Sequence, residues 1–218
     1  MNKVKKFAHK GRFAVIERFR KHIIVYAIAG GLVSAGLFLA FDRQMQFYLL
    51  GAGVISVLYT LPIFGKKMRL RDFSYIKIFL IACVWAYVTE TIPLLRNDVE
   101  RDLIGYLFVE RVCFFLAITI PFDIRDLEVD KVNHVKTIPT LLGASNATYL
   151  SLGLICIAGL IEWFVIQDQH LGSTSAIMAY VVTAVIIWMV RTKKNDYYFS
   201  GLLDGTIMLP YLMLVING

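Results

Sequence analysis

Long apolar segments run through this chain, and they restrict its fold more than any other feature of the sequence. The length of each segment is close to that of an α-helix that crosses a lipid bilayer, about 20 residues. Backbone N–H and C=O groups find no water partner in lipid, so each segment has to be helical. The prediction is an all-α fold, a polytopic transmembrane helical bundle of about seven spans. The predicted spans are residues 22–41, 46–64, 73–95, 104–122, 147–166, 174–190 and 200–216.

The composition agrees with a membrane protein and differs from that of a typical soluble domain. Of the 218 residues, 58% are hydrophobic and 18% are charged, and the mean hydropathy is +0.65. Soluble domains carry about 25% charged residues. No internal repeat or linker suggests a second domain. We therefore predict one transmembrane domain over 1–218, with a basic arm over 1–21 and the helical bundle over 22–218.

The distribution of basic residues predicts the orientation of the bundle in its membrane. Eighteen of the 23 Lys and Arg residues fall in the N-terminal arm and in the loops on its side, whereas Arg43, Arg96 and Arg101 occupy the opposite loops. By the positive-inside rule, the N-terminus and the charged loops are cytoplasmic and the C-terminus lies outside. The predicted location is the plasma membrane, or the inner membrane of a bacterium. The net charge of +7 is thus a topology signal, and no nucleic-acid partner is expected.

The stretch PFDIRDLEVDKVNH, residues 121–134, is unusually acidic for a segment beside a membrane span. If the fourth span continues through it as a helix, Asp123, Asp126 and Asp130 share an arc of about 60°, with Glu128 about 140° away from Asp123. Carboxylates on one helix face repel one another, and a bound cation removes that repulsion. Carboxylate oxygens suit Mg²⁺, which is commonly held together with substrate phosphates. The alternative is a solvated loop neutralised by neighbouring bases.

A second loop on the same predicted side is basic. LYTLPIFGKKMRLRD, residues 58–72, carries Lys66, Lys67, Arg69 and Arg71 near the membrane surface. Clustered acids and clustered bases on one side fit a metal-bridged diphosphate, with ammonium and guanidinium groups holding its oxygens. The alternative interpretation is that these bases only anchor the loop on the cytoplasmic side.

Two segments together resemble the UbiA superfamily of intramembrane prenyltransferases. FDIRDLEVDKVNHVKTIPTLLG, residues 122–143, is similar to the second aspartate-rich motif of that superfamily and to its trailing Thr-x-Pro segment. LYTLPIFGKK, residues 58–67, is similar to its Tyr-x-x-Pro segment. The resemblance covers almost the whole chain. It implies a Mg²⁺-dependent enzyme in the lipid bilayer that ionises a prenyl diphosphate and passes the carbocation to a hydrophobic or aromatic acceptor.

The resemblance also implies the residues of the site. Asp123, Asp126 and Asp130 would be catalytic and would hold Mg²⁺. The residues implied for substrate binding are Tyr59, Lys66, Lys67, Arg71 and Lys131.

The chain departs from the superfamily pattern in one respect. It has no counterpart of the first aspartate-rich motif, Asn-x-x-x-Asp, and its spans match the third to ninth helices of such enzymes. Three interpretations follow: a shortened product or mis-assigned start, a member that completes its site in an oligomer or with a second subunit, or a catalytically impaired or non-enzymatic relative. A CDP-alcohol phosphotransferase is disfavoured, because Asp204-Gly205 lacks the Ala-Arg that follows in that class.

Ionisable residues within or near the spans are expensive in lipid. Glu90 and Glu162 lie close enough to the outer span ends that we expect them to reach the interface. Glu110 and Arg111 are adjacent and diverge by about 100° on a helix, so the sequence does not predict that they pair.

Overall fold

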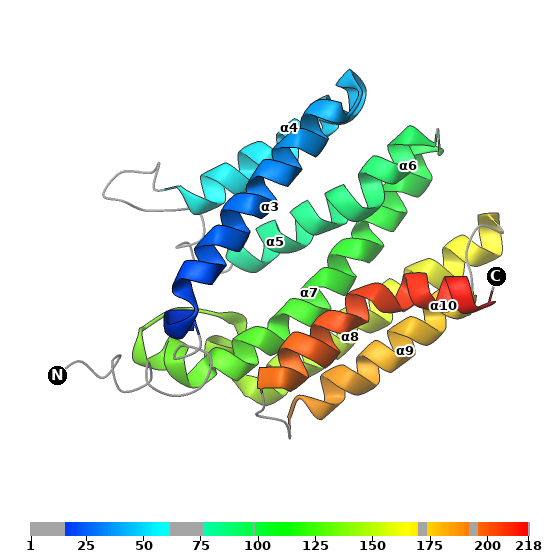
Figure 1. Cartoon of the computed structure of the whole chain (residues 1–218). Coiled ribbons are helices and arrows are strands. Elements are labelled where there is room, and N and C mark those ends of the chain that lie inside the picture. Colours follow the sequence, from blue (N-terminus) through cyan, green and yellow to red (C-terminus); the bar gives the residue numbers. More distant parts are fainter. Residues whose placement is uncertain (1–15, 62–75, 98, 170–173, 192–195, 218) are drawn as a thin grey trace. The chain divides into compact units, whose positions relative to one another are not determined.

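The computed structural model describes residues 16–61, 76–97, 99–169, 174–191 and 196–217 (Figure 1). Over these ranges the chain is helical and contains no strand, which confirms the all-α prediction. The α-helices are α3 (Arg20–Ala40), α4 (Arg43–Thr60), α5 (Ile76–Ala86), α6 (Ile92–Arg96), α7 (Arg101–Val132), α8 (Ile138–Gln169), α9 (Thr174–Met189) and α10 (Leu209–Asn217). Two π-helices, η2 (Tyr87–Thr91) and η3 (Tyr198–Leu203), and the 3₁₀-helix η4 (Thr206–Met208) complete the order.

Helices cover most of the described residues of each of the seven predicted spans. Four helical segments in the described ranges are long and apolar enough to cross a membrane: Arg20–Ala40, Ile76–Arg96, Arg101–Val132 and Ile138–Val165. Ala176–Met189 is a shorter apolar helix. α7 and α8 extend well beyond the predicted fourth and fifth spans, 104–122 and 147–166. Polar residues at the ends of these two helices continue the helical backbone.

The chain divides into two compact units, Met1–Leu50 and Gly51–Gly218. In the first, α3 turns into the start of α4, and Gln46 closes this turn by donating through Nε2 to the carbonyl oxygens of Phe38 and Phe41, both at 3.0 Å. Almost all of this unit's described side chains are exposed, as expected for an apolar helix that faces lipid. The single domain over 1–218 stays a prediction.

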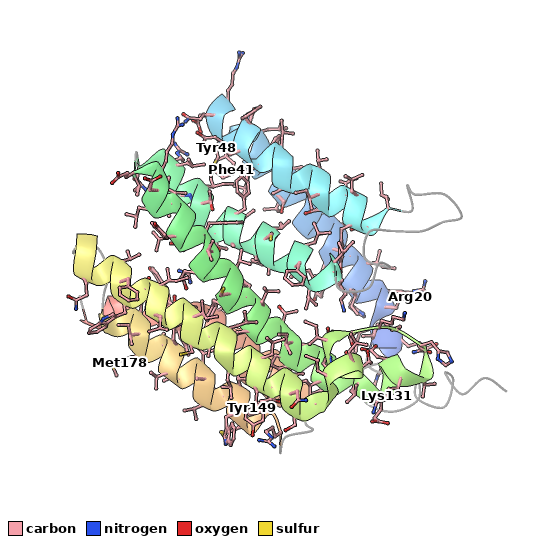
Figure 2. The ribbon with its side chains drawn as sticks, turned by 180° about the vertical axis from the view of Figure 1, so that it is seen from behind. Arg20, Phe41, Tyr48, Lys131, Tyr149 and Met178 are labelled. Carbon is pink, nitrogen blue, oxygen red and sulfur yellow. The ribbon has the colours of Figure 1, made fainter. Side chains whose placement is uncertain are left out.

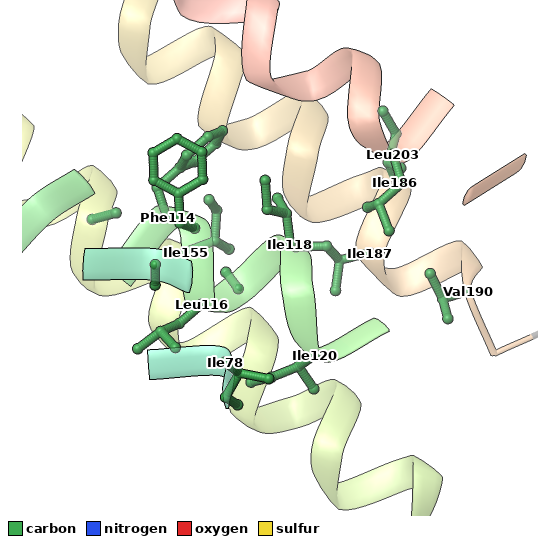
Figure 3. Packing of buried hydrophobic residues seen from close by; sticks show 14 of the residues in the cluster. Ile78, Phe114, Leu116, Ile118, Ile120, Ile155, Ile186, Ile187, Val190 and Leu203 are labelled. Atoms are coloured by element: carbon green, nitrogen blue, oxygen red, sulfur yellow. The ribbon is translucent and has the colours of Figure 1, made fainter. Parts of the chain in front are cut away.

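In the second unit α7 is the central helix and packs against α5 and α8, while α9 packs against α8 and α10. Its middle turn is buried all round: the five consecutive residues from Phe114 to Ile118 are each less than 7% exposed. A helix that is apolar on every face belongs inside a bundle. Figure 3 shows Ile78 of α5, Ile155 of α8 and Ile187 of α9 among the side chains gathered around this turn.

Pro121 lies inside α7 and leaves one backbone carbonyl of the helix free. Proline has no N–H, so the carbonyl of Ala117, four residues earlier, loses its usual helical donor. The hydroxyl of Ser151, on α8, donates a hydrogen bond to that carbonyl in the buried interior. A side chain of the neighbouring helix thus satisfies the polar group that the proline exposes.

Replacing Ser151 by alanine should destabilise the protein by about 1–3 kcal/mol, because the buried Ala117 carbonyl would lose the hydroxyl that takes the place of the missing N–H. The check is the thermal unfolding midpoint of the detergent-purified chain, with Ser34→Ala on an exposed face of α3 as the matched control. Equal midpoints for Ser151→Ala and the control would show that this hydrogen bond contributes nothing to stability.

The charged residues in the interior form a cluster around Arg111. Arg111 lies with Nη2 at 2.8 Å from Glu90 Oε2 and with Nε at 3.5 Å from Glu110 Oε2. The sequence left open whether Glu110 and Arg111 pair, and the structure places their charged atoms at ion-pair distance without a hydrogen bond between them. That Glu90 and Glu162 reach the interface stays a prediction; in the structure Glu90 pairs with Arg111, and Glu162 is 9% exposed.

Candidate functional site

The three predicted aspartates lie on the C-terminal part of α7, which continues without a break to Val132. The helical spacing assumed from the sequence therefore holds, and about 10 Å of helix separates Asp123 from Asp130. Asp123 is 6% exposed, and Asp126 and Asp130 are half-buried. These carboxyl groups form a row that runs from the bundle interior toward the end of the helix.

Lys77, in the first turn of α5, is the basic partner of the row. Its Nζ lies 3.6 Å from Asp123 Oδ1, and about half of its side chain stays exposed. Lys77 is not among the site residues that the sequence predicted. Its place at the start of the third span, at the same bundle end as the acidic stretch, was the available signal.

Arg125 holds Asp126 with two hydrogen bonds, from Nε to Oδ1 at 3.1 Å and from Nη2 to Oδ2 at 3.2 Å. The guanidinium carbon lies 5.1 Å from the ring centre of Phe122 and 5.3 Å from that of Phe199. Aromatic faces attract a cation at such distances and fix its position. Arg125 therefore neutralises the middle carboxylate of the row and connects α7 to η3.

The Thr-x-Pro segment after α7 packs back onto the third aspartate. Thr137 is the residue before α8, and its hydroxyl donates to Asp130 Oδ2 at 3.4 Å. Its backbone N–H donates to Thr140 Oγ1 at 2.7 Å, the reciprocal half of a capping box. Pro139 occupies the first turn, where its missing N–H costs nothing. The segment thus has two roles: it caps the start of α8, and through the Thr137 hydroxyl it holds the Asp130 carboxylate.

α8 bends directly after this first turn. Gly143 has φ +79° and ψ 159°, a backbone conformation that residues with a Cβ rarely adopt. The glycine separates the short turn 138–142, which contacts Asp130 through Thr137, from the long apolar part of α8. The predicted fifth span, 147–166, lies wholly in the long part of α8 after this bend.

The electrostatics of the row favour a bound cation. Burial raises the pKa of Asp130, which lies past the apolar segment 104–122, and the Asp126 carboxylate raises it further. Lys77 and the Thr137 hydroxyl act in the opposite direction but do not restore the ordinary value. Negative charge on these groups is therefore unfavourable unless more positive charge is supplied.

Two of the other predicted substrate contacts, Tyr59 and Lys131, can be placed in the structure, and neither belongs to this row. Tyr59 lines a small cavity of about 160 Å³ between α4 and α5, together with Ser56 and Trp85. Lys131 lies near the end of α7 in Figure 2, and its Nζ is 3.7 Å from Oε1 of the exposed Glu128. The predicted contacts Lys66, Lys67 and Arg71 lie outside the described residues.

The donor set suits a hard divalent cation that shares its ligands with a substrate. Within the part of the chain that the structure describes, no three His, Cys, Asp or Glu side chains converge closely enough to hold a metal ion by themselves. Mg²⁺ does not need them, since it usually takes one or two carboxylates and completes its shell with water and phosphate oxygens. Asp123 and Asp130 offer carboxylate oxygens of this kind, whereas Arg125 already occupies both oxygens of Asp126.

A comparison with protein-family models gives one match that covers most of the chain. Residues 14–198 match the family described as the UbiA prenyltransferase family. No curated protein and no solved structure matches the chain. The matched range contains the aspartate row, Lys77 and the Thr-x-Pro segment.

Proposed function

The chain belongs to the UbiA prenyltransferase family, and from this premise we propose that it transfers a prenyl group from a prenyl diphosphate to a hydrophobic or aromatic acceptor inside a membrane. Family membership supports prenyl transfer to an acceptor in general. Dependence on Mg²⁺, with Asp123, Asp126 and Asp130 as the metal-binding carboxylates, is part of our proposal. The site would face the cytoplasm, as the loop charges predict.

One observation carries the proposal: the carboxylate row continues on a single helix from the buried Asp123 to the end of α7, with Lys77 beside it. Such a row can contact a metal–diphosphate complex at the mouth of the bundle while the prenyl chain stays among apolar side chains. The second loop would add Lys66, Lys67 and Arg71 as donors to the diphosphate oxygens. Tyr59 and Lys131 remain proposed substrate contacts.

The proposed reaction exchanges one bond of the prenyl carbon for another. The bond between the prenyl carbon and the diphosphate oxygen breaks, and its electron pair leaves on the diphosphate. The acceptor supplies the electron pair of the new bond and then loses a proton. A bound Mg²⁺ would supply positive charge where the diphosphate gains negative charge. Lys77 would add a donor at the same place, and the buried surroundings of Asp123 would keep water from the carbocation.

Removal of the metal provides the direct test. We expect the detergent-purified chain to bind a radiolabelled prenyl diphosphate in the presence of Mg²⁺ and to lose that binding in EDTA, because two polyanions otherwise repel each other. Binding that is equal in both conditions would contradict the metal site. No binding by well-folded protein in either condition would instead favour the catalytically impaired or non-enzymatic alternative.

A further inference from the structure

A second polar site lies inside the bundle, away from the aspartate row. A cavity of about 550 Å³ is bounded by residues of η2, α6, α7, α8, α9 and α10, and most of its lining is apolar. Its charged lining residues are Glu90, Arg111 and Glu162. Twelve residues of α7, about 18 Å of helix, separate Arg111 from Asp123. The cavity has the volume of a small-molecule site, and its charged residues lie well away from the carboxylates of the row.

Glu162 is the residue that points to a ligand. It lines the cavity and is 9% exposed, and within the described part of the chain it has no hydrogen bond and no ion pair within 4 Å. Arg111 acts on it only at longer range. Buried carboxyl groups are almost always hydrogen-bonded, because an unpaired one loses its water without compensation. The Glu162 carboxyl group opens onto the cavity, which has room for a donor that the described residues do not supply.

The surrounding charges indicate the sign of that donor. Arg111 is already engaged by Glu90 at 2.8 Å and lies 3.5 Å from Glu110, which also accepts a hydrogen bond from the Tyr180 hydroxyl. Among the described residues, one guanidinium thus faces three carboxyl groups. These carboxyl groups would repel a negatively charged ligand group. They would attract an ammonium group.

We propose that this cavity binds an amphiphile whose head group carries a protonated amine. The ammonium donates to the Glu162 carboxylate, and the hydrocarbon part lies against apolar lining residues such as Leu107, Phe114 and Ile207. The amine belongs either to the head group of a bilayer lipid or to a free long-chain amine, and the chemistry of recognition is the same for both. The Glu162 carboxyl group that binds the amine is separate from the carboxylates of the aspartate row.

The test uses a photoreactive long-chain primary amine that carries a diazirine, with its alcohol twin as the neutral probe. The full-length chain is reconstituted in phosphatidylcholine nanodiscs and the labelled peptides are identified. We expect the amine to label the cavity-lining peptides of α7 and α8 about tenfold more strongly than the alcohol, in line with one charge-assisted hydrogen bond. Equal labelling by the two probes would overturn the proposal.

Matched variants separate this site from general membrane partitioning. Glu162→Gln keeps the shape of the side chain and should lower amine labelling about tenfold, to the level of the alcohol. Glu128→Gln, on a side chain that is 82% exposed, should leave labelling unchanged. Unfolding midpoints of both variants show whether they are folded. Undiminished labelling of a folded Glu162→Gln variant would also overturn the proposal.

Competition identifies the source of the amine. Displacement of the probe by phosphatidylethanolamine in the nanodisc, as well as by free dodecylamine, would support a lipid head group as the ligand. Displacement by dodecylamine alone would support a free long-chain amine. Displacement by neither, at concentrations that saturate the nanodisc, would contradict a specific site.

Discussion

Replacing Arg111 by methionine is expected to destabilise the protein by about 3–5 kcal/mol, the cost of leaving buried carboxylates without their cation. Methionine keeps the length and much of the volume of the side chain, so the change isolates the loss of charge. Glu90, 2.8 Å from the guanidinium, and Glu110, which is fully buried, would both lose their ion partner. The measurement is the free energy of unfolding of the detergent-solubilised chain.

Two further variants make this prediction specific. Arg101→Met, on an exposed position in the first turn of the same helix, should change the free energy of unfolding by less than about 0.5 kcal/mol. Adding Glu90→Gln and Glu110→Gln to Arg111→Met should recover a large part of the lost stability, because no unpaired charge then remains between these three positions. A single Arg111→Met variant as stable as the Arg101→Met control would show that the cluster is not held by its ion pairs.

Replacing Asp123, Asp126 and Asp130 together by asparagine should weaken Mg²⁺-dependent binding of a prenyl diphosphate by about 100-fold or more, while the chain stays folded. Each change keeps the size of the side chain and removes one negative charge. The folded state should tolerate them, because the three carboxylates repel one another and their removal relieves that repulsion. Titration of a radiolabelled prenyl diphosphate at fixed Mg²⁺ measures the change.

Single replacements should rank the three positions. Asp126→Asn should have the smallest effect, since Arg125 already occupies both of its carboxylate oxygens, and Asp123→Asn the largest, since that carboxylate is buried. Glu128→Gln serves as the control within the same acidic stretch but on the exposed side. Unchanged binding by the folded triple variant would remove these aspartates from the site, whatever the function of the chain.

Hydrophobic segment length predicted the helical class and the approximate position of every described helix, because lipid leaves a chain no other regular structure. It could not predict that α7 continues to Val132. The length of α7 depended on whether the charged stretch after residue 122 stays helical. The spacing of the aspartates was interpreted on the assumption that it does, and could not establish it. The partner of the row, Lys77, was also missed, since its contact with Asp123 is made by packing of α5 against α7.

The interior charges show a different limit of sequence reasoning. The angle between neighbouring residues on a helix separates Glu110 from Arg111, but it does not take into account the length of the arginine side chain. It also does not predict the position of Glu90, which lies in the π-helix η2. A π-turn shifts every later residue of its helix relative to ordinary spacing, so a count of 100° per residue fails beyond it. Pro93, just after η2, was the signal in the sequence that the regular hydrogen-bond pattern would be interrupted there.

Pro121 and Ser151 have a consequence for how this chain can vary. The proline frees the Ala117 carbonyl and the serine occupies it, so neither residue acts independently of the other. In a Pro121→Ala background the restored N–H of residue 121 would compete for the same oxygen, and the effect of Ser151→Ala should shrink. Such non-additivity means that the effect of a substitution at one position depends on the residue at the other, so that tolerated changes at the two positions are expected to occur in pairs.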